Sequence, residues 1–253
     1  MSRLDDLWRR EHWWDPPPEP PTRPPLAEAA IVGGIAATHV VDHLIVPRRF
    51  HLGTHLAGAA AAVGAALAAG ATIDDLGLRP DHVPHGLRRG ALSAAGITAA
   101  IGLGAALPQT RRWFDDERVL DVSRGEALFR GLVEIPIGTA VYEEVVFRGV
   151  LLGLALRRLP PLPAALVTSG LFGLWHVLPS LRDRRYSPAV RDQHPAAVAV
   201  ATVANTAAVG LALAWQRLRT NSVAAPIVTH TASNAIAYLA AAALSRVRQG
   251  DTR

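Results

Sequence analysis

Two adjacent carboxylates and an arginine interrupt an otherwise apolar stretch of this 253-residue chain. They are Glu143, Glu144 and Arg148, and valines, leucines and isoleucines lie on both sides of them. A charged group at the centre of a membrane helix costs about 2.5–3.5 kcal/mol on insertion scales, and such groups persist where they face a protein interior or a water-filled cavity. The cluster is therefore a candidate functional site. The alternative is a buried ion-pair network that only fixes helix packing.

Helix geometry separates the two carboxylates of this cluster. Glu144 and Arg148 are four residues apart with the acid first, which is the favourable order for a pair on one helix face. Glu143 points about 100° away and shares its face with Phe147. We expect Arg148 to hold Glu144 ionised and in place, which leaves Glu143 free for chemistry.

Two later apolar stretches each carry a further pair of residues four positions apart. Phe172 and His176 form one pair, and His230 and Asn234 form the other. A lone histidine in a helix is more often a packing residue, so each pair is a weak signal by itself. Peptide hydrolysis without a serine or cysteine nucleophile needs a base that activates water, and Glu143 suits that role. An asparagine amide and an imidazole N–H are suitable donors to the oxyanion that forms.

Taken together, these residues resemble the intramembrane protease family that includes the CAAX prenyl endopeptidases and the bacteriocin-immunity proteins called Abi or CPBP. The matching residues are Glu143, Glu144, Arg148, Phe172, His176, His230 and Asn234, with a looser echo at Asp75 to Arg79. The resemblance covers roughly residues 120–240. It implies an all-helical membrane fold and endopeptidase activity, in which Glu143 activates water with assistance from His176. It also implies that His230 and Asn234 stabilise the oxyanion.

Two cofactor states fit these residues. Glu143, His176 and His230 could supply a set of two histidines and one glutamate with an open fourth position, as in zinc hydrolases, and the family is commonly classed as metalloproteases. Against zinc, the sequence has no His-Glu-x-x-His pair, and the three candidate ligands come from different helices. We favour a glutamate-activated water with no required metal, and Zn²⁺ is the alternative.

The composition predicts the elements that must position these residues. Half of the residues are hydrophobic, the mean hydropathy is +0.20, and the charges cluster between long apolar runs. This pattern predicts an all-α, polytopic transmembrane helical bundle of about seven spans, or eight, with a polar catalytic cavity between the late helices. The seven expected spans are residues 26–46, 52–71, 90–107, 131–156, 164–179, 195–215 and 223–244.

The charge distribution narrows the partners and the location. The net charge is +5, and all 26 basic residues are arginine. The arginines lie in short loops, which suits anionic lipid headgroups at the membrane flanks rather than a nucleic acid. No cysteine is present, which excludes disulfides, thiolate nucleophiles and cysteine metal sites. We expect a multi-pass membrane protein whose partners are the lipid bilayer and a membrane-associated peptide or protein. The absence of lysine suggests a GC-rich coding sequence, so we expect the membrane to be that of a bacterial cell.

Several segments lie outside the motif pattern. Residues 1–25 are predicted to be a polar, proline-rich tail, cytosolic or interfacial, residues 26–245 the bundle, and residues 246–253 a polar end. Residues 109–129 are expected on the membrane surface, and Pro136 is expected to kink the helix after them. In the first span, His39, Asp42 and His43 share one face and could form a metal or proton site, or an interhelical hydrogen-bond cluster.

The sequence is consistent with three functions. The first is an intramembrane endopeptidase that hydrolyses a peptide bond of a membrane-associated or lipidated peptide or protein through a glutamate-activated water. The second is a non-catalytic membrane immunity or scaffold protein that retains the motif residues for packing or partner binding. The third is a small-ion transporter, motivated by His39, Asp42 and His43, which would need an internal repeat or paired discontinuous helices that the sequence does not show. We expect the first.

Overall fold

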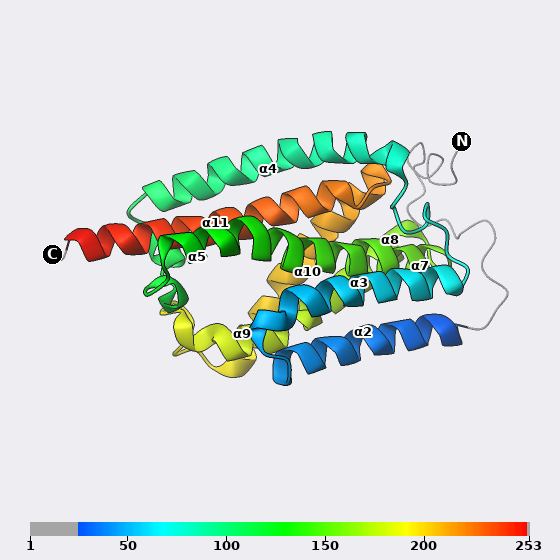
Figure 1. Cartoon of the computed structure of the whole chain (residues 1–253), viewed down its shortest axis with the longest axis horizontal. Helices are drawn as coiled ribbons and strands as arrows, with labels where there is room; N and C mark the ends of the chain where they lie inside the picture. Colours follow the sequence, from blue (N-terminus) through cyan, green and yellow to red (C-terminus); the bar gives the residue numbers. More distant parts are fainter. Residues whose placement is uncertain (1–24, 252–253) are drawn as a thin grey trace.

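The computed structural model describes residues 25–251, and within this range the chain forms helices and connecting turns with no β-strand. The predicted tail at residues 1–24 and the last two residues of the predicted polar end lie outside the described part. Figure 1 shows the long helices running side by side as a bundle. Its main elements are α2 (Leu26–Leu44), α3 (His51–Ala68), α4 (Val83–Ala106), α5 (Arg124–Phe129), α8 (Pro161–Trp175), α9 (Val177–Asp183), α10 (Pro195–Thr220) and α11 (Ala224–Asp251).

Within residues 25–251, five helical segments are long and apolar enough to cross a membrane. This supports an integral membrane protein, but the number is smaller than the seven spans expected. They are Arg48–Ala68, Pro80–Ala106, Pro161–Tyr186, Pro195–Thr220 and Ala224–Gln249. The other two expected spans are helical, but their polar groups set them apart. α2 contains Glu28, His39, Asp42 and His43, and the helix through residues 131–156 carries the cluster at Glu143, Glu144 and Arg148. The count of seven or eight spans is therefore not confirmed.

Several helices extend beyond the apolar stretches that mark them in the sequence. α4 begins at Val83 rather than near residue 90, and α11 continues through most of the predicted polar end to Asp251. Arginine is a good helix former, so a helix can continue past its hydrocarbon segment into charged sequence. Hydropathy therefore marked the apolar part of each helix and missed its polar ends.

The helix that carries the two glutamates is continuous from Arg124 to Leu156, in five consecutive segments. These are α5, η5 (Arg130–Val141), α6 (Tyr142–Glu144), η6 (Val145–Leu151) and α7 (Leu152–Leu156). η5 and η6 have the wider π-helical winding, and Pro136 lies inside η5. Proline cannot donate an intrahelical N–H, and the expected kink takes the form of this change in winding. Wider turns of this kind are frequent at functional sites.

The long glutamate-bearing helix lies at the centre of the bundle. It packs between α3 on one side and α11 on the other, while α4 runs along α11 and α2 runs along α3 (Figure 1). α10 packs against α8 and α11. The largest buried apolar cluster includes Tyr142, Phe147, Phe172 and Trp175, so it surrounds the predicted site residues.

The segment with the looser similarity to the family pattern, Asp75 to Arg79, is a partly buried loop between α3 and α4. Asp75 closes its first turn with Thr72, since each backbone N–H donates to the other residue's side-chain oxygen, at 2.9 and 3.1 Å. The carbonyl of Asp75 accepts a 3.0 Å hydrogen bond from the guanidinium of Arg217, which is fully buried in α10. Gly77 follows with φ +65°, and a Cβ there would lie 2.1 Å from Arg217. The loop therefore anchors the end of α10 that precedes α11.

Gly77→Ala should strongly destabilise the protein. The substitution adds a left-handed backbone strain of about 1 kcal/mol or more and overpacking of about 1–3 kcal/mol against Arg217. We expect the free energy of unfolding in detergent to fall by about 2–4 kcal/mol, as measured by denaturant titration. Gly70→Ala is the matched control, because Gly70 also has a positive φ of +85°, but the nearest atom that a Cβ there would meet is 3.7 Å away. Equal losses for both variants would contradict the anchoring role of Arg217.

Candidate active site

Arg148 and Glu144 form the buried ion pair that their spacing predicts. The guanidinium Nη1 of Arg148 donates to Oε1 of Glu144 at 2.9 Å, and the exposed fractions of the two residues are 2% and 0%. The second nitrogen, Nη2, donates to the backbone carbonyl of Gly210 in α10 at 3.2 Å. The guanidinium also lies over the ring of Phe172 in α8, 4.1 Å from its centroid. One cation therefore joins the glutamate-bearing helix to α8 and α10.

His230 in α11 takes its orientation from Glu144. Its Nδ1 lies 2.7 Å from Oε1 of Glu144, and a carboxylate only accepts, so Nδ1 carries the proton. In the neutral ring, Nε2 is then an acceptor, and it lies 2.9 Å from the amide Nδ2 of Asn234. The same Nε2 is 3.8 Å from Oε2 of Glu143. Glu144 thus fixes both the tautomer and the direction of this imidazole.

His176 is fixed in the same tautomer by a different acceptor. It lies at the junction of α8 and α9, where its Nδ1 donates to the backbone carbonyl of Phe172 at 2.8 Å. Its Nε2, unprotonated in the neutral ring, is 3.7 Å from Oε2 of Glu143. Two imidazoles from separate helices therefore present acceptor nitrogens to one carboxylate oxygen.

The carboxylate of Glu143 lacks the partners that its neighbour has. Its Oε2 is buried and has no hydrogen-bond partner among the described residues. A water molecule about 2.8 Å from this oxygen and from Nε2 of His176 could donate one O–H to each, because both are acceptors separated by 3.7 Å. This is the arrangement that a general base needs to activate water.

The same three residues are the candidate metal ligands of the sequence. A zinc ligand atom lies about 2.0–2.2 Å from the ion for histidine nitrogen and carboxylate oxygen. Within residues 25–251, no group of three or more histidine, aspartate or glutamate side chains is arranged to hold a metal ion. Glu143, His176 and His230 therefore do not fit Zn²⁺ in this arrangement. The proposed mechanism uses the side chains and water alone.

All six predicted site residues meet at one place, but sequence reasoning missed some of their supports. Gly210 supplies an acceptor to Arg148 and leaves room for its guanidinium, since a Cβ there would lie 3.2 Å from Nη2. A glycine opposite an arginine has no sequence signature. Asn205 lies in an apolar stretch of α10 but is exposed. His39 and Asp42 of α2 are buried, and the ring of His39 stacks on Trp175, although their spacing in the sequence indicated no connection to the site.

One protein-family model matches this region of the chain. Residues 126–236 match the family model described as type II CAAX prenyl endopeptidase, Rce1-like. The match includes every predicted site residue and confirms the resemblance predicted from the motifs, while α2, α3 and α4 lie outside it. No curated protein and no solved structure matches the chain.

The two adjacent glutamates should respond in opposite directions to the same substitution. Glu143→Gln places an amide where the unpartnered carboxylate oxygen lies, and this amide can donate to Nε2 of His176. We therefore expect the unfolding midpoint to rise by about 2–4 °C, the equivalent of about 1 kcal/mol. Glu144→Gln leaves Arg148 without its counter-charge, which should lower the free energy of unfolding by about 3–5 kcal/mol. Thermal unfolding of purified protein in detergent measures both. If both variants were equally destabilised, Glu143 would be part of the packing network.

Proposed function

We propose that this chain is an intramembrane endopeptidase that hydrolyses a peptide bond of a membrane-associated or lipidated peptide or protein. The observation that carries the proposal is the buried, unpartnered Oε2 of Glu143, which faces the Nε2 atoms of His176 and His230 at 3.7 and 3.8 Å. Glu144 also has a buried, unpartnered Oε2, but its Oε1 accepts from Arg148 and His230, whereas no described residue donates a hydrogen bond to the carboxylate of Glu143. The match to a protease family over the same residues supports this reading.

The reaction begins with a water held between Glu143 and His176. As the water oxygen bonds to the scissile carbonyl carbon, Glu143 takes its proton, and the carbonyl oxygen becomes an oxyanion. When the tetrahedral intermediate collapses, the C–N bond breaks and Glu143 passes the proton to the leaving amine. Its two neighbouring imidazoles cannot donate to its carboxylate in their neutral forms, so Glu143 keeps an oxygen lone pair available for the proton.

Asn234 in α11, oriented by His230, would stabilise the oxyanion. The Nδ2 amide of Asn234 carries two protons, and only one of them points to His230. The second can reach a substrate oxygen. Nε2 of the neutral His230 accepts from that amide, so His230 acts on the oxyanion by orienting Asn234. Glu144 and Arg148 hold His230 in turn and act as positioning residues behind the oxyanion site.

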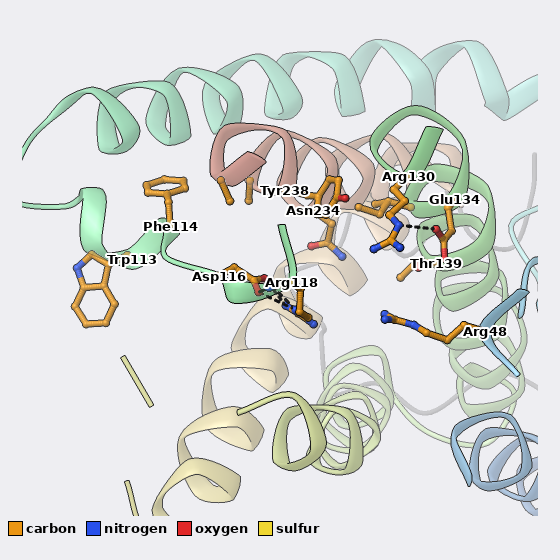
Figure 2. A pocket seen from close by; sticks show the side chains of 13 residues that line it. Arg48, Trp113, Phe114, Asp116, Arg118, Arg130, Glu134, Thr139, Asn234 and Tyr238 are labelled. Atoms are coloured by element: carbon orange, nitrogen blue, oxygen red, sulfur yellow. Dashed lines mark hydrogen bonds and ion pairs between the residues drawn. The ribbon is translucent and has the colours of Figure 1, made fainter. Parts of the chain in front are cut away.

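A cavity of about 450 Å³ beside the catalytic residues can hold a peptide segment, because ligand sites commonly have volumes of about 300–1,000 Å³. Asn234 and Thr139 line it, and Thr139 is four residues before Glu143 on the same helix. Figure 2 shows Phe114 and Trp113 on one side of this cavity and Arg48 on the other. We therefore expect the bound segment to contain apolar side chains close to the scissile bond.

Other residues that line the cavity are charged. Arg118 donates to Asp116 at 2.7 Å, and these hydrogen bonds raise the pKa of Arg118 above its ordinary value. Arg130 lies 4.0 Å from Glu134 (Figure 2). Arg48, in contrast, forms no ion pair with a described residue and its side chain extends towards the cavity (Figure 2). It is the residue best placed to pair with an anionic group of the substrate.

Cleavage should depend on the two groups that hold the water and should be indifferent to chelator. Purified wild type, Glu143→Gln and His176→Ala would be incubated in detergent with farnesylated and unmodified membrane peptides, with and without EDTA, and products counted by mass spectrometry. We expect Glu143→Gln to lose at least about 10³-fold of the activity and His176→Ala at least about 10²-fold, the scale of a lost general base and its partner. Glu117→Gln, which alters an exposed surface ion pair, should cleave like wild type.

Activity that vanished with chelator and returned with zinc would contradict this mechanism and make Glu143, His176 and His230 ligands. Full activity of Glu143→Gln would refute its role as base.

Asn234→Ala should separate catalysis from binding. Removal of one oxyanion donor costs about 10²–10³ in kcat in other hydrolases, because the donor acts mainly in the transition state. We expect that loss in kcat with KM changed less than about threefold, measured by steady-state kinetics on any peptide that the wild type cleaves. Asn205→Ala, at an exposed position of α10, is the matched control and should be silent. An increase in KM alone would place Asn234 in ground-state binding instead.

A further inference from the structure

A second polar cluster contacts Tyr142 and Trp175, the residues that directly precede Glu143 and His176. It lies in helices outside the matched segment. It consists of His39 and Asp42 of α2 and His55 of α3, and the first two are 7% and 3% exposed. Nδ1 of His39 and Oδ2 of Asp42 are buried without a hydrogen-bond partner among the described residues. The three residues do not form a metal site by the arrangement of their side chains. Buried polar atoms without partners are costly, so a cluster that persists needs a reason other than packing.

His55 contacts the turn that leads into Glu143. Its Nδ1 donates to the backbone carbonyl of Gly138 at 2.5 Å, in η5. Its ring stacks on Tyr142, the residue before Glu143, with centroids 4.4 Å apart and planes 12° apart. Its other nitrogen, Nε2, is 3.6 Å from Oδ2 of Asp42. The imidazole thus bridges α2 to both ends of the turn between Gly138 and Tyr142.

That turn is unusual because its own hydrogen bonds follow the π-helical pattern of η5, with Pro136 two residues before Gly138. A π-helical segment is less regular than an α-helix and depends more on contacts from outside. A side-chain N–H on the Gly138 carbonyl, together with a ring against Tyr142, provides such contacts. The orientation in which Glu143 leaves this turn is therefore set partly from α3.

His39 makes a corresponding contact next to His176, the second catalytic residue. Its ring stacks on the indole of Trp175, with centroids 3.6 Å apart and planes 30° apart. Trp175 is the last residue of α8 and directly precedes His176. The indole also meets Phe147 edge-on, at 5.2 Å between centroids. It is thereby held between α2 and the glutamate-bearing helix, and the backbone that carries His176 is held with it.

We propose that His55, Asp42 and His39 are positioning residues that fix Glu143 and His176 at the separation needed to hold the reacting water. The inference rests on the proposed function, and it assigns to α2 and α3 a part in the site that the matched segment does not contain. His55 acts through Gly138 and Tyr142, His39 acts through Trp175, and Asp42 lies against the imidazole of His55. A misplacement of about 1 Å can cost about 10²-fold in rate, so loose contacts here would affect the chemistry without touching substrate.

The kinetic test compares three variants in α3, with a fluorescence-quenched farnesylated peptide in detergent as the probe. His55→Leu removes the donor to Gly138 and should lower kcat by about 10–100-fold with KM within about twofold of wild type. His55→Asn retains a donor at the δ position and should recover kcat to within about threefold of wild type. Thr54→Val is the control, because the hydroxyl of Thr54 donates to the His51 carbonyl within its own helix, α3, and not to the glutamate-bearing helix. Wild-type kcat for His55→Leu, or no rescue by asparagine, would overturn the proposal.

A second measurement decides the proposal without any cleavage. In the wild-type background, Glu143→Gln should raise the unfolding midpoint, because Glu143 is held in an unfavourable place. In the His55→Leu background Glu143 can turn away, so the same substitution should raise the midpoint by less than about 1 °C. An equal rise in both backgrounds would overturn the positioning role. Should His55→Leu not fold, Asp42→Asn, which preserves the side-chain size, serves in its place with the same expected loss of the rise.

The two measurements keep the two claims apart. A wild-type protein that cleaves neither this probe nor the other peptides would count against the proposed function, and the comparison of unfolding midpoints would still decide whether α3 holds Glu143 in place. A wild type that cleaves the probe, together with an unaffected His55→Leu, would leave the endopeptidase intact and overturn the positioning residues alone.

Discussion

The interaction on which the site depends is the buried ion pair between Arg148 and Glu144. A buried pair is stable only when its geometry is good and its remaining polar atoms find partners. Here the guanidinium also reaches the Gly210 carbonyl and the Phe172 ring, and the carboxylate also accepts from His230. The pair therefore fixes three helices around one charge and sets the tautomer of an imidazole. Without it, neither His230 nor the oxyanion site that we propose would have a defined orientation.

We propose different roles for the two neighbouring glutamates because their surroundings differ. Glu144 has a cation and an imidazole N–H within 2.9 Å, whereas Oε2 of Glu143 faces two acceptor nitrogens and has no partner among the described residues. A site arranged in this way sacrifices local stability for reactivity, as active sites commonly do. The cluster of His39, Asp42 and His55 fits the same account, because a group held away from its most stable arrangement requires contacts that hold it.

Sequence reasoning reached the parts of this arrangement that depend on local spacing. The four-residue separation of Glu144 and Arg148 predicted their ion pair, and the order of the three motifs predicted the resemblance that the match at residues 126–236 confirms. It did not reach what depends on packing between distant segments. The stacking of His39 on Trp175 joins residues 136 positions apart, and the acceptor for Arg148 is a backbone carbonyl in another helix. The expected number of spans also exceeded the five that hydropathy and helix length support, because polar functional residues lower the hydropathy of the helices that carry them.

The most direct test of the central claim is an experimental density map of the wild-type protein, at a resolution that shows ordered water, with anomalous data collected at the zinc edge. The account predicts a water peak about 2.8 Å from both Oε2 of Glu143 and Nε2 of His176, with no anomalous signal. An anomalous peak about 2.0–2.2 Å from these atoms would show a metal centre. A direct hydrogen bond between the carboxylate and either imidazole, leaving no room for water, would show that Glu143 is a packing residue. Either of these last two results would contradict the account.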